Sequence, residues 1–403
     1  MPPEGTYRRA TLVRSMKFGL CGRLTCGTIM IMATPASVTQ APAARLTGWD
    51  SIEFWVGNAR AMAGFLSGSF GFTITAYAGP ETGVADRASY LLEQGTIRLV
   101  VTSGLTPESE IWNHVREHGD GAHDLAFLVD DASETYEAAI ARGARRVDEP
   151  YELQDDHGVL RLSSVATYGE TKHTFVDRRE YHGHYCPGFS RDGVPAAPVG
   201  PTVGLVAIDH VVGNVEEGRL DEWVAFYEDV MGFGQLRHFD ESQISTEFSA
   251  LRSTVVWNGN NIVMPLNEPA EGKRKSQIQE YIDTYRGPGV QHLAFRTNDV
   301  LQAITALRAR GVRFLEANAA YYDDVRTRLS FLDLPWDEIV RLGILVDHEP
   351  DGYLLQLFSE PVTDRPTVFV EIIQRAGARG FGEGNFKALF ESIERQQALR
   401  GNL

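Results

Sequence analysis

A chain of 403 residues is too long for one ordinary compact core, so we expect two domains or two fused halves. Its 38 basic and 54 acidic residues give a net charge of −16, which would repel a phosphate backbone and argues against nucleic acid or an anionic membrane as a partner. The three cysteines, Cys21, Cys26 and Cys186, are too few and too scattered for a disulfide framework. We therefore expect a reducing compartment, the cytoplasm.

The N-terminal segment 1–31 differs from the rest, because it is rich in basic residues and nearly free of acids. This composition is typical of a targeting peptide, but the basic residues interrupt every apolar run. We expect residues 1–46 to be an extension that is disordered or reflects a misassigned start codon, with the biological start near Met32. No later segment approaches the ~20 apolar residues that a membrane helix needs.

The rest of the chain repeats itself. Three pairs of segments match in character and order: 52–58 with 208–214, 121–127 with 289–295, and 174–177 with 368–371. Such internal similarity indicates a tandem duplication, with halves at roughly 48–180 and 206–375.

Each half has the pattern of a strand, a helix and then several strands. In the second half apolar residues recur at helical spacing between 220 and 231, which predicts one buried helix face. Alternating or β-branched runs at 205–212, 293–297 and 367–373 predict strands. The Pro- and Gly-rich stretch 187–204 predicts a linker between a domain at 47–186 and a domain at 205–403.

Comparing the halves points to chemistry. Three positions differ between them in this alignment: Phe54 and His210, Asp124 and His292, and Asp177 and Glu371. All are predicted to lie on strands, which could bring the side chains to one face of a sheet. Two histidines and a carboxylate leave three positions open on an octahedral metal, the arrangement of iron(II) oxygenases. Spacing alone would also suit zinc or nickel, and a lone histidine in an apolar strand is more often a hydrogen-bonded core residue.

Several segments of the second half carry a more specific resemblance. They are 208–214, 265–269 (Pro-Leu-Asn-Glu-Pro), 273–278, 289–292 and the tail from 364 to 403. From about residue 46 to the C-terminus the chain resembles the vicinal oxygen chelate superfamily, and within it the 4-hydroxyphenylpyruvate dioxygenases. The resemblance implies an α+β fold of tandem βαβββ modules in two open-barrel domains, with no metal in the first domain and a gating helix at the C-terminus.

The same resemblance implies a reaction. His210, His292 and Glu371 would bind one Fe(II) per chain, and the keto acid of an aryl-pyruvate would chelate it, with O2 as co-substrate and no external oxoglutarate. Oxidative decarboxylation, ring hydroxylation and side-chain migration would then give homogentisate and CO2. Relatives commonly form homodimers or homotetramers, so we expect the same here.

The resemblance also implies a substrate pocket. Its polar members would be Ser253, Asn267, Gln277, Gln291 and Gln356, and its aromatic wall Phe358, Phe369, Phe381 and Phe386. Gln277, Gln291 and Phe386 are the expected catalytic residues. At any one of these sites the ordinary explanation is strand-end hydrogen bonding, an exposed position for Gln356, or core packing for a phenylalanine. Around Phe386, however, apolar residues at i, i+3, i+4 and i+7 predict an amphipathic helix, which would close the site.

Three alternatives remain open. A hydroxymandelate synthase would use the same substrate and metal but oxidise the benzylic carbon. Such enzymes lack the Pro-x-Asn-Glu-Pro stretch and tend to have a smaller aliphatic residue at the position of Phe386. A binding protein of the same fold would normally lose its metal ligands, whereas all three are present here. An extradiol catechol dioxygenase would share the ligand triad but act on a catechol.

Overall fold

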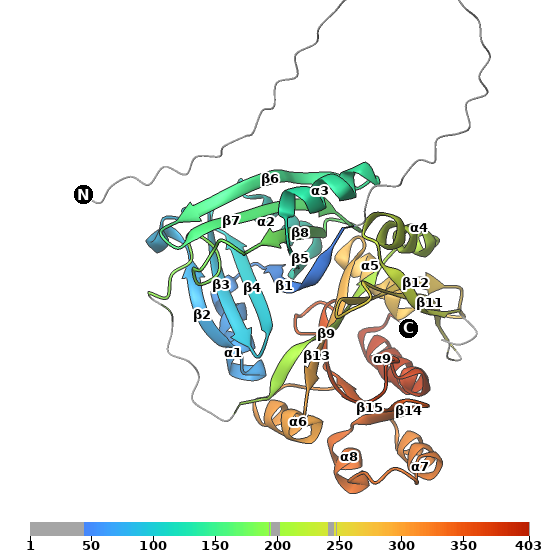
Figure 1. Cartoon of the computed structure of the whole chain (residues 1–403). Coiled ribbons are helices and arrows are strands. Elements are labelled where there is room, and N and C mark those ends of the chain that lie inside the picture. The colour runs from blue at the N-terminus through green and yellow to red at the C-terminus, as the bar shows by residue number, and fades with distance from the viewer. Residues whose placement is uncertain (1–43, 193, 195–201, 241–245, 247, 403) are drawn as a thin grey trace, which may run out of the picture.

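The computed structural model describes residues 44–192, 194, 202–240, 246 and 248–402. Figure 1 shows two curled sheets standing side by side, each with helices packed around it. Residues 1–43 of the expected extension, including Cys21 and Cys26, lie outside the described residues, as do residues 193 and 195–201 of the predicted linker. No described helix has the length and apolar character that crossing a membrane requires.

The two sheets have the same strand order, which confirms the predicted duplication. The first contains β1 (Leu46–Trp55), β2 (Thr73–Ala78), β3 (Arg87–Gln94), β4 (Ile97–Gly104), β5 (Gly121–Val129), β6 (Arg146–Asp155), β7 (Gly158–Ala166) and β8 (Lys172–Asp177). The second contains β9 (Leu205–Asn214), β10 (Gly234–Phe239), β11 (Ala250–Trp257), β12 (Val263–Ala270), β13 (Gly289–Thr297), β14 (Leu345–Glu349), β15 (Gly352–Phe358) and β16 (Phe369–Ala376). The orders are β2-β3-β4-β1-β5-β8-β7-β6 and β10-β11-β12-β9-β13-β16-β15-β14.

The helices complete four βαβββ modules, two in each sheet, so the predicted α+β fold is confirmed. In the first half they are α1 (Ala59–Phe70), η1 (Pro80–Thr82), α2 (Glu110–His118) and α3 (Ala132–Ala141). The second half has α4 (Leu220–Ala225), η2 (Phe226–Val230), α5 (Gln277–Tyr285), α6 (Val300–Ala309), α7 (Ala319–Arg328), α8 (Trp336–Leu342), η3 (Glu383–Asn385) and α9 (Phe386–Arg400). The helix predicted around Phe386 is therefore present.

The repeat extends to helix caps. Asp131 caps α3 by accepting a hydrogen bond from a backbone N–H, and Asp299 caps α6 in the same way. Each helix is followed by a glycine with positive φ, Gly143 at 104° and Gly311 at 87°. The same local signals therefore start and stop the corresponding helix in each half.

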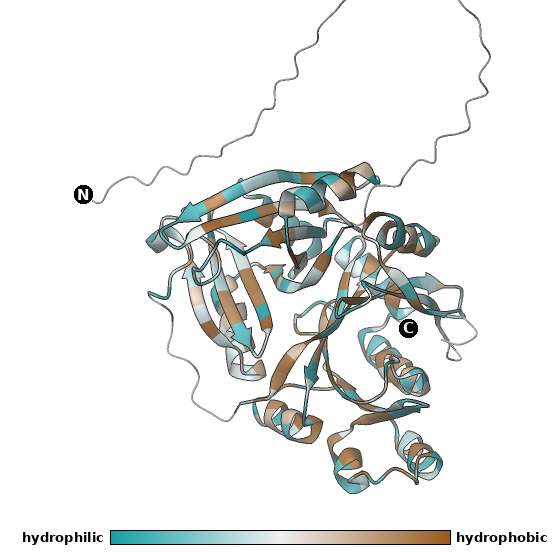
Figure 2. Cartoon of the chain, in the orientation of Figure 1, coloured by the Kyte–Doolittle hydropathy of each residue, from teal (hydrophilic) through white to brown (hydrophobic). Residues whose placement is uncertain are grey.

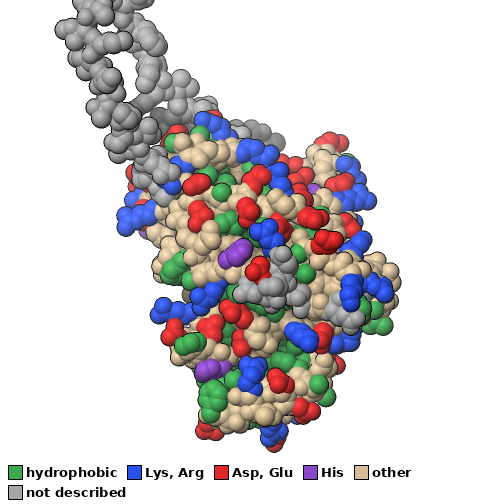
Figure 3. Space-filling model, turned by 90° about the vertical axis from the view of Figure 1, so that its right-hand side faces the viewer, with side chains coloured by type: hydrophobic (Ala, Val, Ile, Leu, Met, Phe, Trp, Pro, Cys, Tyr) green, Lys and Arg blue, Asp and Glu red, His purple; other side chains and the backbone are tan. Residues whose placement is uncertain are grey.

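The core joins the two halves. Figure 2 shows apolar residues recurring along strands such as β3, β4 and β7. One buried cluster contains residues of both sheets, and Phe72 meets Phe295 edge to face with ring centroids 5.7 Å apart. Polar contacts cross the same boundary, because the Tyr227 hydroxyl lies 2.9 Å from Nε2 of His173. On the face in Figure 3, acidic and basic side chains are interspersed over the described surface.

Candidate metal centre

The second sheet brings His210, His292 and Glu371 together on three adjacent strands. Ala294 of β13 is paired with His210 on one side and with Glu371 on the other, so their side chains share a face of the sheet. Nε2 of His210 lies 3.1 Å from Oε2 of Glu371, and Nε2 of His292 lies 3.3 Å from the same oxygen. All three residues are buried. Three ligand atoms thus converge on one point.

The donor set fits a metal ion. Ligand atoms at 2.0–2.1 Å from an octahedral ion lie about 3.0 Å apart, close to the two separations found here. The other carboxylate oxygen, Oε1 of Glu371, is buried and has no hydrogen-bond partner among the described residues. Such an oxygen is costly to bury unless a cation or a donor meets it.

The charges of the three side chains are strongly coupled. Burial disfavours the charged form of His210, but the carboxylates of Glu371 and Asp209 outweigh burial and raise its pKa to about 9. Burial also opposes ionisation of Glu371, yet His210 and His292 lower its pKa to about 2. Burial lowers the pKa of His292. Metal binding at this site would therefore displace a proton from His210.

Outer groups fix the orientation of both histidines. Nδ1 of His210 lies 2.8 Å from the Asp209 carboxylate, and Nδ1 of His292 lies 2.9 Å from Oε1 of Gln291. Protons on these Nδ1 atoms leave each Nε2 free as a ligand. Arg375 holds Asp209 through bonds of 2.7 and 2.9 Å, and it donates to the carbonyl of Gly380 at 2.6 Å. His210 is thus connected, through Asp209 and Arg375, to the segment that leads into α9.

A pocket opens onto the triad. Eight of the nine predicted substrate-contacting residues line it: Ser253, Asn267, Gln277, Gln291, Phe358, Phe369, Phe381 and Phe386. Its cavity measures about 70 Å³, and Leu389, Phe390 and Ile393 of α9 cover it.

Three of the aromatic residues also contact His210 or His292. Phe369 stacks on His292 with ring centroids 4.8 Å apart, and Phe358 meets the same ring edge to face. Phe381 meets His210 edge to face at 5.3 Å. These rings therefore hold the two histidine side chains in place as well as lining the pocket.

Gln356 is the predicted residue that lies outside the pocket lining. It is 1% exposed, so it is not the exposed strand residue that an ordinary alternation would give. It contacts the segment before α9, since a Cβ added at Gly382 would lie 2.1 Å from Nε2 of Gln356.

Comparison with known proteins identifies the family. Residues 41–187 match the family model "Hydroxyphenylpyruvate dioxygenase, HPPD, N-terminal", and residues 207–357 match "Glyoxalase/Bleomycin resistance protein/Dioxygenase superfamily". The chain is 45% identical to 4-hydroxyphenylpyruvate dioxygenase of Yarrowia lipolytica over 88% of this chain and 93% of that protein. It is also 45% identical to the enzyme of the same name from Dictyostelium discoideum, over 89% and 100%. The chain belongs to the 4-hydroxyphenylpyruvate dioxygenase family.

A solved relative has a different name. A triple mutant of 4-hydroxymandelate synthase from Streptomyces coelicolor is 33% identical, with a TM-score of 0.77, covering 87% of this chain and 99% of that chain. Its sequence identity is lower than that of the two dioxygenases.

Strand register corrects one repeat equivalence. In the second sheet of this 4-hydroxyphenylpyruvate dioxygenase family member, Ala294, two positions after His292, pairs with His210. In the first sheet Ala126, two positions after Asp124, pairs with Ser51. Ser51 therefore occupies the position equivalent to His210, and the prediction that Phe54 occupies it was wrong.

The third equivalence also shifts. In the second sheet Ile372, the residue after Glu371, pairs with Phe295. In the first sheet Phe175, the residue after Thr174, pairs with Phe127. Phe127 occupies the same position in the first half as Phe295 does in the second. Thr174 is therefore equivalent to Glu371, and the prediction of Asp177 for this position was wrong.

The first half consequently has no histidine at any of the three equivalent positions. The backbone N–H of Thr174 donates to Asp124 at 3.1 Å, and Nζ of Lys172 lies 3.7 Å from the same carboxylate. Within the described residues, no group of metal-ligating side chains lies at this place.

Sequence reasoning missed the outer supports and part of the pocket. Arg375 lies 166 residues from Asp209, and no pattern links the two in the sequence. Further lining residues are apolar and look like ordinary core: Val212, Phe239, Leu251, Val255 and Pro265. A comparison of the two halves in the correct register would have shown that the two residue types recur together, because Asp50 and Arg178 stand at the positions of Asp209 and Arg375.

Proposed function

We propose that this chain is an iron(II) enzyme of the cytoplasm that converts 4-hydroxyphenylpyruvate and O2 into homogentisate and CO2. One iron per chain would be held by His210, His292 and Glu371, and no external oxoglutarate would be needed. The observation that carries the proposal is the convergence of three buried ligand atoms on one point at the base of an aromatic pocket. The names of the relatives support the substrate.

Bound iron(II) would supply Lewis acidity and open positions for the keto acid and O2. The protein's own residues would bind and orient the rest of the substrate. Ser253 and Asn267 are directly paired across β11 and β12, so their side chains face the pocket together. Gln277, the first residue of α5, and Gln291 add amide groups that can donate to or accept from the phenol and the keto acid.

The C-terminal helix would exclude water from the reaction. The cavity of about 70 Å³ is far smaller than the ~300 Å³ or more of a typical ligand pocket, so α9 has to move to admit the substrate. Arg400 and Asn402 tie the end of the helix to Glu280, at 2.7 and 2.8 Å. Closing over the substrate removes water and positions the reacting groups.

Gln356 would support the start of this motion. Gly382 has φ of 76°, and the closely packed Gln356 amide leaves no room there for a side chain. Glycine reaches backbone conformations that other residues avoid, so this segment can change its conformation at Gly382, and we assign Gln356 to packing against the hinge before η3.

Hydroxymandelate synthase is the second candidate function, since a solved relative bears that name. The two reactions share the substrate and the metal and differ in which carbon is oxidised. Phe386 lines the pocket and meets Phe239 edge to face at 5.4 Å, so its bulk would fix where the substrate ring lies. This packing favours ring oxidation over benzylic oxidation.

The test is reconstitution without oxygen. Purified chain is loaded with iron(II) anaerobically, mixed with 4-hydroxyphenylpyruvate and O2, and the products are identified by mass spectrometry while O2 uptake is followed. Homogentisate in proportion to O2 consumed is expected, and Glu371→Gln should give none. Hydroxymandelate as the product would support the second candidate. No O2 uptake by the iron-loaded chain would overturn both and favour a binding protein. Light scattering would test the expected homodimer or homotetramer.

A further inference from the structure

A second cluster of metal-ligating side chains lies about the boundary between the two halves. His114 and His118 stand four residues apart on α2, which places both imidazoles on one face of the helix. Glu170 comes from the turn between β7 and β8, and its Oε2 lies 2.6 Å from Nδ1 of His114 and 3.4 Å from Nε2 of His118. The three ligand atoms all lie within 4.8 Å of one another.

Tyr285 at the end of α5 orients both imidazoles. Its carbonyl oxygen lies 2.6 Å from Nδ1 of His118, and its hydroxyl lies 3.3 Å from Nε2 of His114. A carbonyl only accepts hydrogen bonds, so Nδ1 of His118 carries the proton and Nε2 presents a lone pair. A ring N–H bonded to a backbone carbonyl is the arrangement that usually accompanies a metal-bound histidine.

No donor among the described residues satisfies the lone pair on Nε2 of His118. This nitrogen is buried, and the residue as a whole is 7% exposed. The nearest polar atom across from it is a carboxylate oxygen of Glu170, which also carries a lone pair. Two electron-rich atoms that face each other at 3.4 Å repel each other, and a cation between them would stabilise the pair.

We propose that His114, His118 and Glu170 form a second metal site and that it binds zinc(II). Two nitrogens and one carboxylate oxygen suit zinc, with water as the fourth ligand on the side where Glu170 is exposed. Atoms bound at 2.0–2.1 Å to a tetrahedral ion lie about 3.3 Å apart, near the His118–Glu170 separation. At His114 the metal would take the place of the proton on Nδ1, and the hydrogen bond to Glu170 would open. That proton would move to Nε2 of the same ring, where the Tyr285 hydroxyl oxygen can accept a hydrogen bond from it.

Zinc is favoured over iron at this place. Sites of this kind bind zinc more tightly than iron(II) in the general order of divalent metals. The expected one iron per chain is unaffected, but the expectation of a first domain without metal would not hold.

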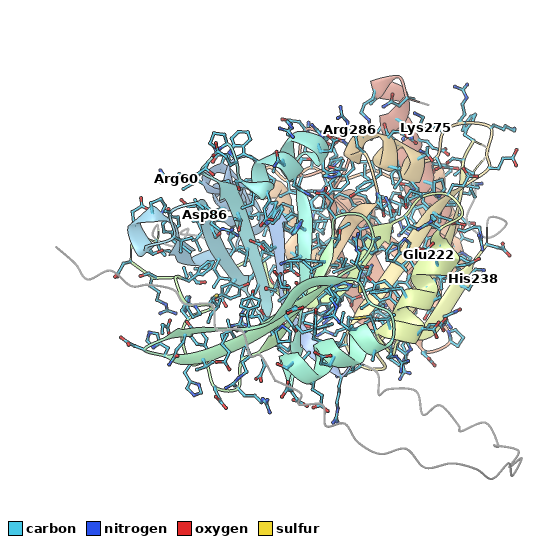
Figure 4. The ribbon with its side chains drawn as sticks, turned by 90° about the horizontal axis from the view of Figure 1, so that it is seen from above. Arg60, Asp86, Glu222, His238, Lys275 and Arg286 are labelled. Atoms are coloured by element: carbon cyan, nitrogen blue, oxygen red, sulfur yellow. The ribbon has the colours of Figure 1, made fainter. Side chains whose placement is uncertain are left out.

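The second site would connect the halves and reach the pocket. The helix α5, whose last residue is Tyr285, begins at the pocket residue Gln277 and carries Glu280, which anchors α9. Figure 4 labels Lys275 just before this helix and Arg286 just after it, which marks where the helix begins and ends. Arg286 also pairs with Glu117 of α2 at 3.2 Å. Zinc would therefore fix α2 against the helix that supports the substrate pocket.

Cobalt(II) is the probe that separates the two sites. Tetrahedral cobalt(II) absorbs visible light far more strongly than octahedral cobalt(II), so the band reports the second site and the total uptake reports both. The metal-free full-length chain would be titrated with cobalt(II), and zinc would then be added to displace the tetrahedral band. We expect two cobalt ions per chain and a tetrahedral band that zinc abolishes.

Variants assign the sites. Glu170→Gln, at an exposed position where folding is not at risk, and His118→Ala should each bind one cobalt without the tetrahedral band. Glu371→Gln should also bind one but keep the band, and the exposed control His157→Ala should bind two. A wild-type chain with one cobalt and no tetrahedral band, or a band that persists in Glu170→Gln, would overturn the proposal. Neither result depends on whether the chain turns over 4-hydroxyphenylpyruvate.

Discussion

Replacing Asp209 by asparagine should weaken iron binding through His210 without touching the metal. The carboxylate of Asp209 orients His210 and is itself held by Arg375. Substitutions in this outer shell typically cost 10–100-fold in metal affinity, or about 1.4–2.7 kcal/mol. The folded state should also lose stability, on the order of 1.5–3 kcal/mol, because a hydrogen bond to a charged group is weakened.

The first half supplies a matched control. Asp50 pairs with Arg178 at 2.8 Å, in the same register as Asp209 with Arg375 at 2.7 Å. The side chains of Arg178 and Arg375 are similarly covered, at 18% and 17% exposed. Asp50→Asn should therefore cost at least as much stability, since Arg98 also lies 3.5 Å from Asp50, but it should leave iron affinity unchanged.

The two effects are measured separately. Anaerobic competition with a chromogenic chelator gives the iron(II) affinity, and urea denaturation of the metal-free chain gives the free energy of unfolding. An Asp209→Asn variant that binds iron as tightly as the wild type would refute the role given to Asp209. Equal loss of iron affinity in both variants would show that the pair acts only through general stability.

Three further outcomes are expected. Phe386→Ile should shift the product from homogentisate toward hydroxymandelate, as measured by mass spectrometry. Homogentisate alone, formed at an unchanged rate, would count against the idea that Phe386 positions the substrate ring. Arg400→Met should lower the homogentisate formed per O2 consumed, because α9 loses a bond to Glu280, and it should leave iron uptake unchanged. One homogentisate per O2 in this variant would contradict the role given to the Arg400–Glu280 bond. His173 should make the fold acid-sensitive. Burial lowers its pKa from 6.5 to about 4, so the unfolded chain binds more protons in this range and stability is lost as pH falls below 6.5. By linkage the loss is about 2 kcal/mol at pH 5, and denaturation of His173→Gln should show a pH dependence smaller by that amount.

The sequence predicted what local pattern and composition encode. The duplication, the helix around Phe386 and the two histidines with Glu371 all followed from short segments. The register of β1 did not, because the tripeptide Val-Gly-Asn occurs in both halves but follows β1 in the first and ends β9 in the second. Matching these tripeptides moved the alignment by three residues. Arg375 was missed because its partner is distant in sequence and is set only when the strands pair.

The correct register places a lysine in the first half at a position next to the equivalent of the metal centre. Lys172 occupies the position of Phe369, as each pairs with the central residue of its site, Asp124 or His292. Its ammonium lies 3.7 Å from Asp124 and 3.3 Å from Asp148, so a fixed cation already balances the buried carboxylate.

Introducing the three ligands alone should therefore not create a metal site in the first half. A variant with Ser51→His, Asp124→His and Thr174→Glu would still place the Lys172 ammonium beside the new ligands, where it repels a divalent ion. Adding Lys172→Phe, which copies Phe369, should allow one more cobalt(II) per chain than the parent binds. Urea denaturation would establish that both variants fold. If the triple variant took up the extra cobalt with Lys172 in place, the ammonium would not be the group that keeps metal out of the first half.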